Sequence, residues 1–449
     1  MRQAANALLL LPSLAIQMIP LKSTSIHPFP LTHNPKEIPS ISIMRYFIIP
    51  LLVVVLGVVQ PEAHALEIRD GDKILLLGNT FIERAQKYGY LETAITSANP
   101  DKKLTFRNIG WSGDTVFGHA RSYFGPPQEG FGRLEKLVRE EKPTLILLSY
   151  GANASFEGES GLPGFIKGYD RLIEMLKKTE ARFAVLTPLP QEKLPAPLPD
   201  PTAHNRDLAL YGKALQKWAK GKGIPVIDLF TVLGAGKTHI AGAKTPLTDN
   251  GLHLEGYGYW AGAEVIARAL GQDAKPWSAT VEWTRGQTEA QSAKVKSSRS
   301  GKSKVSIVIE PKTLPAPPPP LHTPNSLTDT RLLPHLIIKK LPSGTWSLKS
   351  RGKVIAKGSY RDWEKGIHLP KTPDAIQAEE LRKLINEKNE LFFHKHRPQN
   401  ETYLFGFRKR EQGNNSVEIP KFNPLILSKE ESINLLKIPK PFTVEFIRD

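Results

Sequence analysis

Between residues 73 and 270, short apolar runs alternate with longer segments of helical periodicity. Runs that are apolar throughout are typical of strands buried on both faces, as in a parallel sheet covered by helices. The pattern therefore predicts a three-layer α/β/α fold around a five-stranded, doubly wound parallel sheet with right-handed crossovers. The predicted strands are residues 74–78, 104–110, 144–151, 182–190 and 224–230, and the predicted helices are residues 81–98, 131–141, 162–178, 203–221 and 256–270.

Composition limits both the chemistry and the partners of this chain. The 449 residues include no cysteine, which excludes a disulfide framework and thiol catalysis. The net charge is +17, but residues 66–271 carry 26 basic and 23 acidic residues, whereas residues 272–449 carry 31 and 19. Because the excess lies in the last third, the α/β region gives no reason to expect a nucleic-acid partner.

Residues 44–65 have the three-part pattern of a secretory signal peptide. Arg45 precedes an apolar stretch over residues 46–59, and the segment ends in Ala-His-Ala. The stretch is too short to cross a hydrocarbon core of about 30 Å, so no membrane span is predicted in the mature chain; a buried first helix or strand is the alternative. We expect a secreted or periplasmic protein in which residues 1–43 are an upstream extension, because a signal peptide is read at the chain terminus.

Polar and glycine residues gather just after the predicted strands. In a parallel sheet the carboxyl ends of the strands lie at one edge, where α/β proteins bind their ligands. Segments far apart in the chain are therefore expected to converge on one crevice. These segments are Gly78-Asn79-Thr80, residues 108–115 (NIGWSGDT), residues 151–154 (GANA) and residues 248–253 (TDNGLH).

The order and spacing of these four segments resemble those of the SGNH (GDSL-like) hydrolase superfamily. The resemblance covers about residues 70–271 and implies a flavodoxin-like domain over residues 66–271 that hydrolyses esters. In such a domain the segments supply a nucleophilic hydroxyl, two groups of an oxyanion hole and a catalytic histidine. Carried over position by position, the resemblance implies Thr80 as the nucleophile and His253 as its base, with Gly113 and Asn153 in the oxyanion hole.

Two positions depart from the family pattern. Thr80 stands where the family has serine, and its methyl group stiffens χ1 and crowds the approach to a carbonyl carbon. Asn250 stands three residues before His253, where the family has aspartate, and an amide supplies no charge to stabilise an imidazolium. Asp249 is the second candidate for the third triad member, although Asp249-Asn250-Gly251 is equally a turn sequence.

Other interpretations of the same residues remain open at this level. Asn79 and Thr80 fit an N-cap pair for the helix that follows. Ser112 is an alternative nucleophile, although in the resembling pattern it only adjoins the oxyanion glycine. Residues 234–238 end in Gly-Lys-Thr but lack the full phosphate-loop spacing. No histidine shows metal-ligand spacing, so neither a metal nor a cofactor is predicted.

Aromatic residues in or near the site segments bear on the substrate. Aromatic faces beside polar loops can stack on sugar rings, and ordinary packing is the alternative. Together with the signal-peptide pattern, they favour a small-molecule or polysaccharide ester as substrate, with an acetyl ester of carbohydrate the first to test. The alternative is a catalytically degraded domain that binds a carbohydrate or a cell-envelope partner. The aromatic residues are Trp111, Tyr123, Phe124 and Phe156.

The composition changes after the α/β region. Residues 272–330 contain a Ser/Lys-rich stretch and the run PAPPPP, which predict a linker or an exposed insertion. Within residues 331–449 the sequence predicts a small β unit, an amphipathic helix over residues 375–393 and a basic tail. The basic run at residues 407–410 fits either a contact with an anionic polymer, which would weaken steeply with salt, or a solvated surface. This region resembles C-terminal segments beside SGNH-like domains in secreted proteins of planctomycete-type bacteria, a resemblance that implies no chemistry.

Overall fold

A computed structural model describes residues 66–123, 125–234, 246–272, 274–300, 303–320, 330–411, 413 and 415–449. The predicted upstream extension (residues 1–43) and signal peptide (residues 44–65) lie outside the described residues, as does Phe124. Among the helices that are described, none is long and apolar enough to cross a membrane.

The predicted α/β/α fold is confirmed. Five parallel strands form one sheet in the order β2-β1-β3-β4-β5, which is the flavodoxin-like order. Each strand lies inside or within one residue of its predicted range. The strands are β1 (Lys73–Gly78), β2 (Thr105–Asn108), β3 (Leu145–Ser149), β4 (Arg182–Leu186) and β5 (Val226–Ile227).

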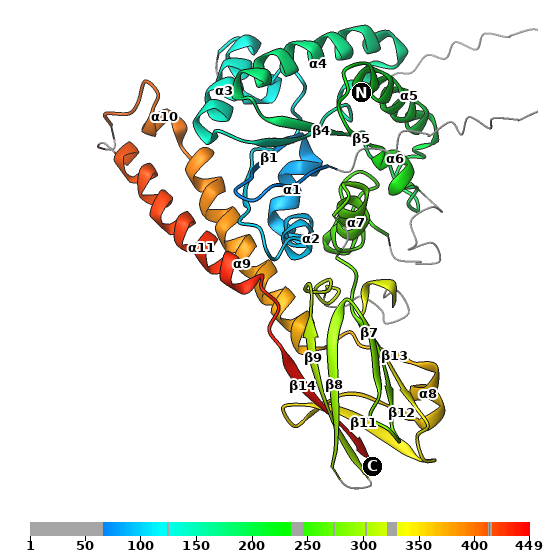
Figure 1. The fold of residues 1–449 in the computed structure, drawn as a ribbon. Helices are drawn as coiled ribbons and strands as arrows, with labels where there is room; N and C mark the ends of the chain where they lie inside the picture. Colours follow the sequence, from blue (N-terminus) through cyan, green and yellow to red (C-terminus); the bar gives the residue numbers. More distant parts are fainter. Residues whose placement is uncertain are drawn as a thin grey trace, which may run out of the picture. The chain divides into compact units, whose positions relative to one another are not determined.

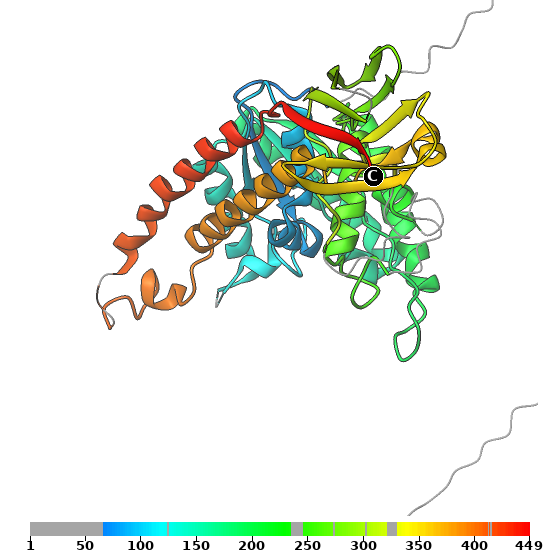
Figure 2. The same cartoon turned by 90° about the horizontal axis from the view of Figure 1, so that it is seen from below.

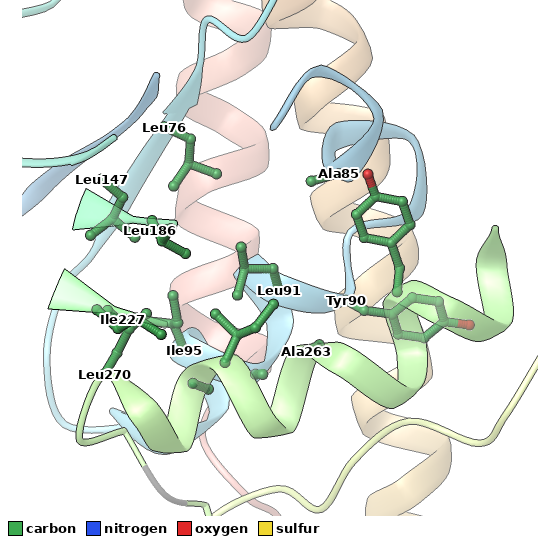
Figure 3. Packing of buried hydrophobic residues seen from close by; sticks show 14 of the residues in the cluster. Leu76, Ala85, Tyr90, Leu91, Ile95, Leu147, Leu186, Ile227, Ala263 and Leu270 are labelled. Carbon is green, nitrogen blue, oxygen red and sulfur yellow. The ribbon is translucent and has the colours of Figure 1, made fainter. Parts of the chain in front are cut away.

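Helices cover both faces of this sheet because successive strand residues point to opposite sides. Leu76 and Leu147 pack on one face against α1, α2 and α7, whereas Leu75 and Ile146 pack on the other against α3, α4 and α5 (Figure 1). Figure 3 shows the packing on the face covered by α1, α2 and α7, where Leu91 of α2 lies between side chains of the strands and of other helices. The helices are α1 (Thr80–Tyr88), α2 (Tyr90–Ala98), α3 (Pro127–Glu141), α4 (Leu162–Leu176), α5 (Thr202–Gly221), the short α6 (Leu229–Val232) and α7 (Gly256–Ala269).

The helix predicted over residues 81–98 is two helices. Gly89 ends α1 in a left-handed conformation, with φ 71°, that other residues adopt at a cost. The apolar period continues through the break, which is why the pattern alone suggested one helix. A Cβ at Gly89 would also lie only 2.1 Å from Oδ1 of Asn386, a residue of the later helix α9 (Pro373–His396). Because Gly89 has no side chain, α9 can pack closely against the end of α1.

Part of the region expected to be a linker forms strands. The described residues between 272 and 330 include four strands. Alternating apolar residues of three of them, β6, β8 and β9, lie in or against a second core with Trp277, Trp283 and Trp346. The expectation of a linker over the Ser/Lys-rich stretch is therefore wrong, because polar residues there occupy the outward positions of strands. These strands are β6 (Ser278–Glu282), β7 (Thr288–Gln291), β8 (Ala293–Ser300) and β9 (Lys304–Pro311).

Two further sheets are built from these strands and from the C-terminal residues. One has the order β13-β10-β6-β7 and the other β12-β11-β14-β9-β8. The last strand of the chain, β14, lies in the middle of its sheet between β11 and β9, although a basic tail was predicted there. The added elements are β10 (His335–Lys339), β11 (Thr345–Ser350), β12 (Lys353–Ser359), α8 (Tyr360–Lys365), β13 (Ile367–His368) and β14 (Phe442–Arg448).

A long helix, α9 (Pro373–His396), contains the predicted helix over residues 375–393. It runs beside α11 (Phe422–Leu436), and the short α10 (Glu401–Leu404) lies between them in the chain (Figure 2). Phe392 of α9 is buried in the same core as α3 and α4. The helix therefore packs directly on the α/β domain.

Candidate active site

The first two predicted segments meet at the start of α1. Asn79 is the N-cap of that helix, its Oδ1 accepting from the N–H of Phe81 at 3.4 Å, so the capping interpretation holds for Asn79. Thr80 is the first helical residue, and its Oγ1 accepts from the backbone N–H of Gly113 at 3.4 Å. The predicted nucleophile and the predicted oxyanion glycine are thus neighbours at a helix N-terminus, where the helix dipole favours negative charge.

The third segment lies next to Gly113. A Cβ built on Gly113 would lie 3.9 Å from the amide nitrogen of Asn153, and Gly113 has a φ of 78° that favours glycine. No hydrogen bond engages the Asn153 side chain within the described part of the chain. The amide of Asn153 therefore lies beside Gly113, whose N–H is directed at the Thr80 hydroxyl.

A cavity of about 120 Å³ is lined by residues of the first, third and fourth segments. Thr80, Asn153 and His253 all line it, together with Arg84, Phe156 and Tyr259. Segments from residues 79 to 253 thus converge as the topology predicted. Among the hydrogen bonds of the described residues, however, none joins the Thr80 hydroxyl to the His253 ring.

The Asn250 side chain favours one tautomer of the neutral His253 ring. Its Oδ1 accepts from the backbone N–H groups of Leu252 and His253, both at 3.0 Å, which fixes the orientation of the amide. Its Nδ2 consequently faces His253 Nδ1 at 3.2 Å. Because an amide nitrogen only donates, Nδ1 must accept, and the proton of the neutral ring lies on Nε2. A general base that takes the Thr80 proton through Nε2 needs the opposite tautomer.

Asp249 pairs with Arg84 and not directly with His253. Its Oδ1 lies 4.0 Å from His253 Nδ1, beyond hydrogen-bond length, whereas its Oδ2 pairs with Arg84 at 3.1 Å. Arg84 also pairs with Glu255 at 2.9 Å, and this guanidinium with its two carboxylates lies beside the cavity. Asp249 therefore offers His253 a nearby charge but no hydrogen bond.

Comparison with known families identifies the α/β region. Residues 83–261 match the profile of the GDSL-like lipase/acylhydrolase family. The α/β domain belongs to this family. Thr80 and the start of its helix lie just before the matched residues, whereas Gly113, Asn153 and His253 lie within them. No curated protein sequence matches the chain.

Solved structures extend the likeness in fold beyond the GDSL-like domain. BT4096, a gut microbial diltiazem-metabolizing enzyme, is similar over 86% of this chain and 100% of its own, with 14% sequence identity and a TM-score of 0.66. Axe2, an acetylxylan esterase from Geobacillus stearothermophilus, covers 45% of this chain and 96% of its own at 18% identity and a TM-score of 0.34. At 14% identity the likeness to BT4096 shows a shared fold and no more.

A buried network holds two of the site loops of the GDSL-like domain. Asp114, next to Gly113, accepts from Arg121 Nε at 2.7 Å and from the Tyr150 hydroxyl at 3.1 Å. Arg121 also donates to the carbonyl of Ile109 at 2.8 Å. Burial and the Asp114 charge raise the pKa of Tyr150 well above its usual value, which keeps it a neutral donor. The network ties the loop after β2 to the loop after β3.

Of the remaining candidates in the GDSL-like domain, Ser112 and Trp111 make contacts away from the cavity, whereas Phe156 lies at it. Ser112 is exposed, does not line the cavity, and donates its backbone N–H to Glu83. Trp111 is covered by the guanidinium of Arg397, whereas Phe156 lines the cavity and is 70% exposed. No cluster of three metal-ligating side chains is found among the described residues.

Sequence reasoning missed Arg84 and Glu192. Arg84 contacts residues 165 and 171 positions away, and no local pattern signals such a pair. Glu192 accepts from the backbone N–H groups of Leu247 and Thr248, both at 3.0 Å, and so holds the segment that leads to His253. It lies in an irregular stretch without periodicity.

Proposed function

We propose that this protein is an ester hydrolase that removes acyl groups, acetyl groups first among them, from carbohydrate esters. The observation that carries the proposal is the shared cavity of Thr80, Asn153 and His253, with the Gly113 N–H 3.4 Å from the Thr80 hydroxyl. Membership of the GDSL-like lipase/acylhydrolase family supports the reaction class. The exposed ring of Phe156 at the cavity and the signal-peptide pattern support a carbohydrate substrate.

The reaction proceeds through an acyl-threonine. Thr80 Oγ1 attacks the ester carbonyl carbon while its proton passes to His253 Nε2. The oxyanion that forms accepts from the N–H of Gly113 and the amide of Asn153. Collapse expels the alcohol, which takes the proton from His253. A water molecule, deprotonated by the same ring, then hydrolyses the acyl-threonine to the free acid and threonine.

The orientation of Asn250 predicts that this reaction is slow. Before His253 can accept a proton at Nε2, its ring must move its own proton to Nδ1, where the Asn250 amide also presents an N–H. Loss of the acid from a Ser-His-Asp triad lowers kcat by about 10⁴ for this reason. Asp249, with its Oδ1 4.0 Å away, offsets part of the charge on the imidazolium.

The same feature favours a second candidate function, carbohydrate binding without turnover. With Nε2 protonated, His253 is a hydrogen-bond donor to the cavity, and Asn153 and Arg84 are further donors there. Such a cavity suits an acceptor-rich neutral ligand whether or not the Thr80 hydroxyl reacts.

Hydrolysis assays separate the two functions. The purified protein is incubated with p-nitrophenyl acetate and with acetylated xylan, beside the variants Thr80→Ala, Thr80→Ser and His253→Ala. The proposal expects measurable acetate release that Thr80→Ala and His253→Ala abolish and Thr80→Ser retains. A wild-type protein that releases no acetate but binds xylan supports the second candidate. Unchanged hydrolysis by Thr80→Ala would exclude Thr80 as nucleophile.

A further inference from the structure

The C-terminal helix α9 is anchored on the GDSL-like domain along its length. Lys388, 1% exposed, donates to Glu92 at 3.0 Å and to the carbonyl of Phe106 at 3.2 Å. Arg382 donates to the carbonyl of Tyr88 at 2.7 Å and lies 4.6 Å from the Tyr90 ring centroid. These contacts fix where the helix ends relative to the domain.

The helix ends at the loop that carries the predicted oxyanion glycine. Its C-cap residue is Arg397, whose guanidinium lies 3.7 Å from the ring centroid of Trp111. Arg397 Nη1 also donates to Glu83 Oε2 at 3.1 Å. The side chains of Arg397 and Glu83 are 28% and 20% exposed, so water screens this ion pair only in part.

Glu83 links Arg397 to the backbone of this loop. The Oε2 atom that accepts from Arg397 also accepts the backbone N–H of Ser112, the residue before Gly113. Arg397 thus holds the loop at Trp111 directly and at Ser112 through Glu83. The next peptide N–H, that of Gly113, is the one that points at Thr80 Oγ1.

We propose that Arg397 is a positioning residue for the oxyanion hole, supplied by a helix outside the family's matched region. The proposal rests on the proposed ester hydrolysis. Its physical basis is that oxyanion donors act only when they are held in place before the charge develops. The planar guanidinium is suited to the task because it stacks on Trp111 and pairs with Glu83 at the same time. The region after residue 271 therefore contributes to the site.

The competing explanation is that Arg397 only fastens α9 to the domain. Arg382 provides a matched control, because it is an arginine of the same helix with one aromatic contact and one hydrogen bond to the domain, remote from the loop. A fastening role predicts similar effects of Arg382→Ala and Arg397→Ala. A positioning role predicts an effect on transition-state stabilisation from Arg397→Ala only.

The test measures kcat and KM for p-nitrophenyl acetate with the full chain and these variants. We expect Arg397→Ala to lower kcat about 10- to 100-fold with KM little changed, and Arg397→Lys, which keeps the charge but not the planar stack, to recover part of it. Glu83→Ala should lower kcat similarly, and the double variant should lose less than the product of the two losses. Equal kcat values for Arg397→Ala and Arg382→Ala would overturn the proposal.

A second readout keeps the proposal testable should the wild-type protein hydrolyse nothing. Amide hydrogen exchange of the peptide around residues 109–118 should quicken in Arg397→Ala and stay at the wild-type rate in Arg382→Ala. Unchanged exchange in Arg397→Ala would overturn the positioning role, whereas absent hydrolysis alone would overturn only the proposed function.

Discussion

Nδ2 of Asn250 lies 3.2 Å from Nδ1 of His253, and two backbone N–H groups hold the amide in that orientation. The contact assigns the proton of the neutral imidazole to the nitrogen that hydrolysis needs as an acceptor. Asn250 therefore positions the histidine ring and at the same time disfavours its use as a base.

Asn250→Asp should raise activity. A carboxylate at this position still accepts from the two backbone N–H groups, and it would accept from Nδ1–H of His253, stabilising the reactive tautomer and the imidazolium. We expect kcat for p-nitrophenyl acetate to rise about 10²- to 10⁴-fold. Asp249→Asn serves as the control, because Asp249 makes no hydrogen bond to the ring and should change kcat far less. A kcat unchanged by Asn250→Asp would show that the tautomer does not limit the rate.

Asn153→Ala should lower kcat about 10²- to 10³-fold with a smaller effect on KM, since an oxyanion donor acts on charge that develops in the transition state. The thermal stability should change little, because the Asn153 side chain makes no hydrogen bond within the described structure. Steady-state kinetics and a melting curve on the same preparation check both statements. A loss confined to KM would place Asn153 in ground-state binding instead.

The fold and the convergence of four segments could be predicted from sequence because both follow from local patterns. Buried strands appear as apolar runs, and parallel topology brings their ends to one edge. The orientation of the Asn250 amide could not be predicted, since it depends on a turn in which Oδ1 binds the N–H groups of Leu252 and His253. The Arg84–Asp249 pair could not be predicted either, because it joins residues 165 positions apart.

Lys388→Met should destabilise the protein by about 3–5 kcal/mol, because it leaves the carboxylate of Glu92, 5% exposed, buried without its cation. Adding Glu92→Leu should restore most of that loss, as apolar replacements of buried pairs often do. Chemical unfolding measures both free energies. Lys383→Met, at an exposed position of the same helix, is the matched control. Equal stability of Lys388→Met and Lys383→Met would contradict the account of how α9 is anchored.

Stability should fall between about pH 6.5 and pH 4. Burial, helped by the nearby charges of Arg121, Arg397 and Lys395, lowers the pKa of His396 to about 4. Since the unfolded chain binds a proton near pH 6.5 and the folded protein only near pH 4, the stability from the neutral ring is present above pH 6.5 and lost as pH falls toward 4. The loss amounts to about 3 kcal/mol.

The variant His396→Phe isolates this effect. Unfolding free energies measured from pH 7.5 to pH 4 should depend less on pH in the variant than in the wild-type protein. Identical slopes in the two proteins would mean that other groups account for the acid sensitivity.

The C-terminal region shows where sequence reasoning reaches its limit. The local periodicity of residues 375–393 predicts a helix there, whereas no local pattern predicts β14, because its partners β9 and β11 lie far away in the chain. Likewise Arg397 and Trp111 are separated by most of the molecule's sequence, and only the docking of α9 brings them together.

Covalent labelling tests most directly whether the hydroxyl of Thr80 is the nucleophile. A fluorophosphonate ester phosphonylates an activated hydroxyl and releases fluoride, and peptide mass spectrometry locates the added group. We predict stoichiometric labelling at Thr80 in the wild-type protein, faster labelling in Asn250→Asp, and none in Thr80→Ala or His253→Ala. Labelling at Ser112, or an unlabelled Thr80 in both the wild-type protein and Asn250→Asp, would contradict the account.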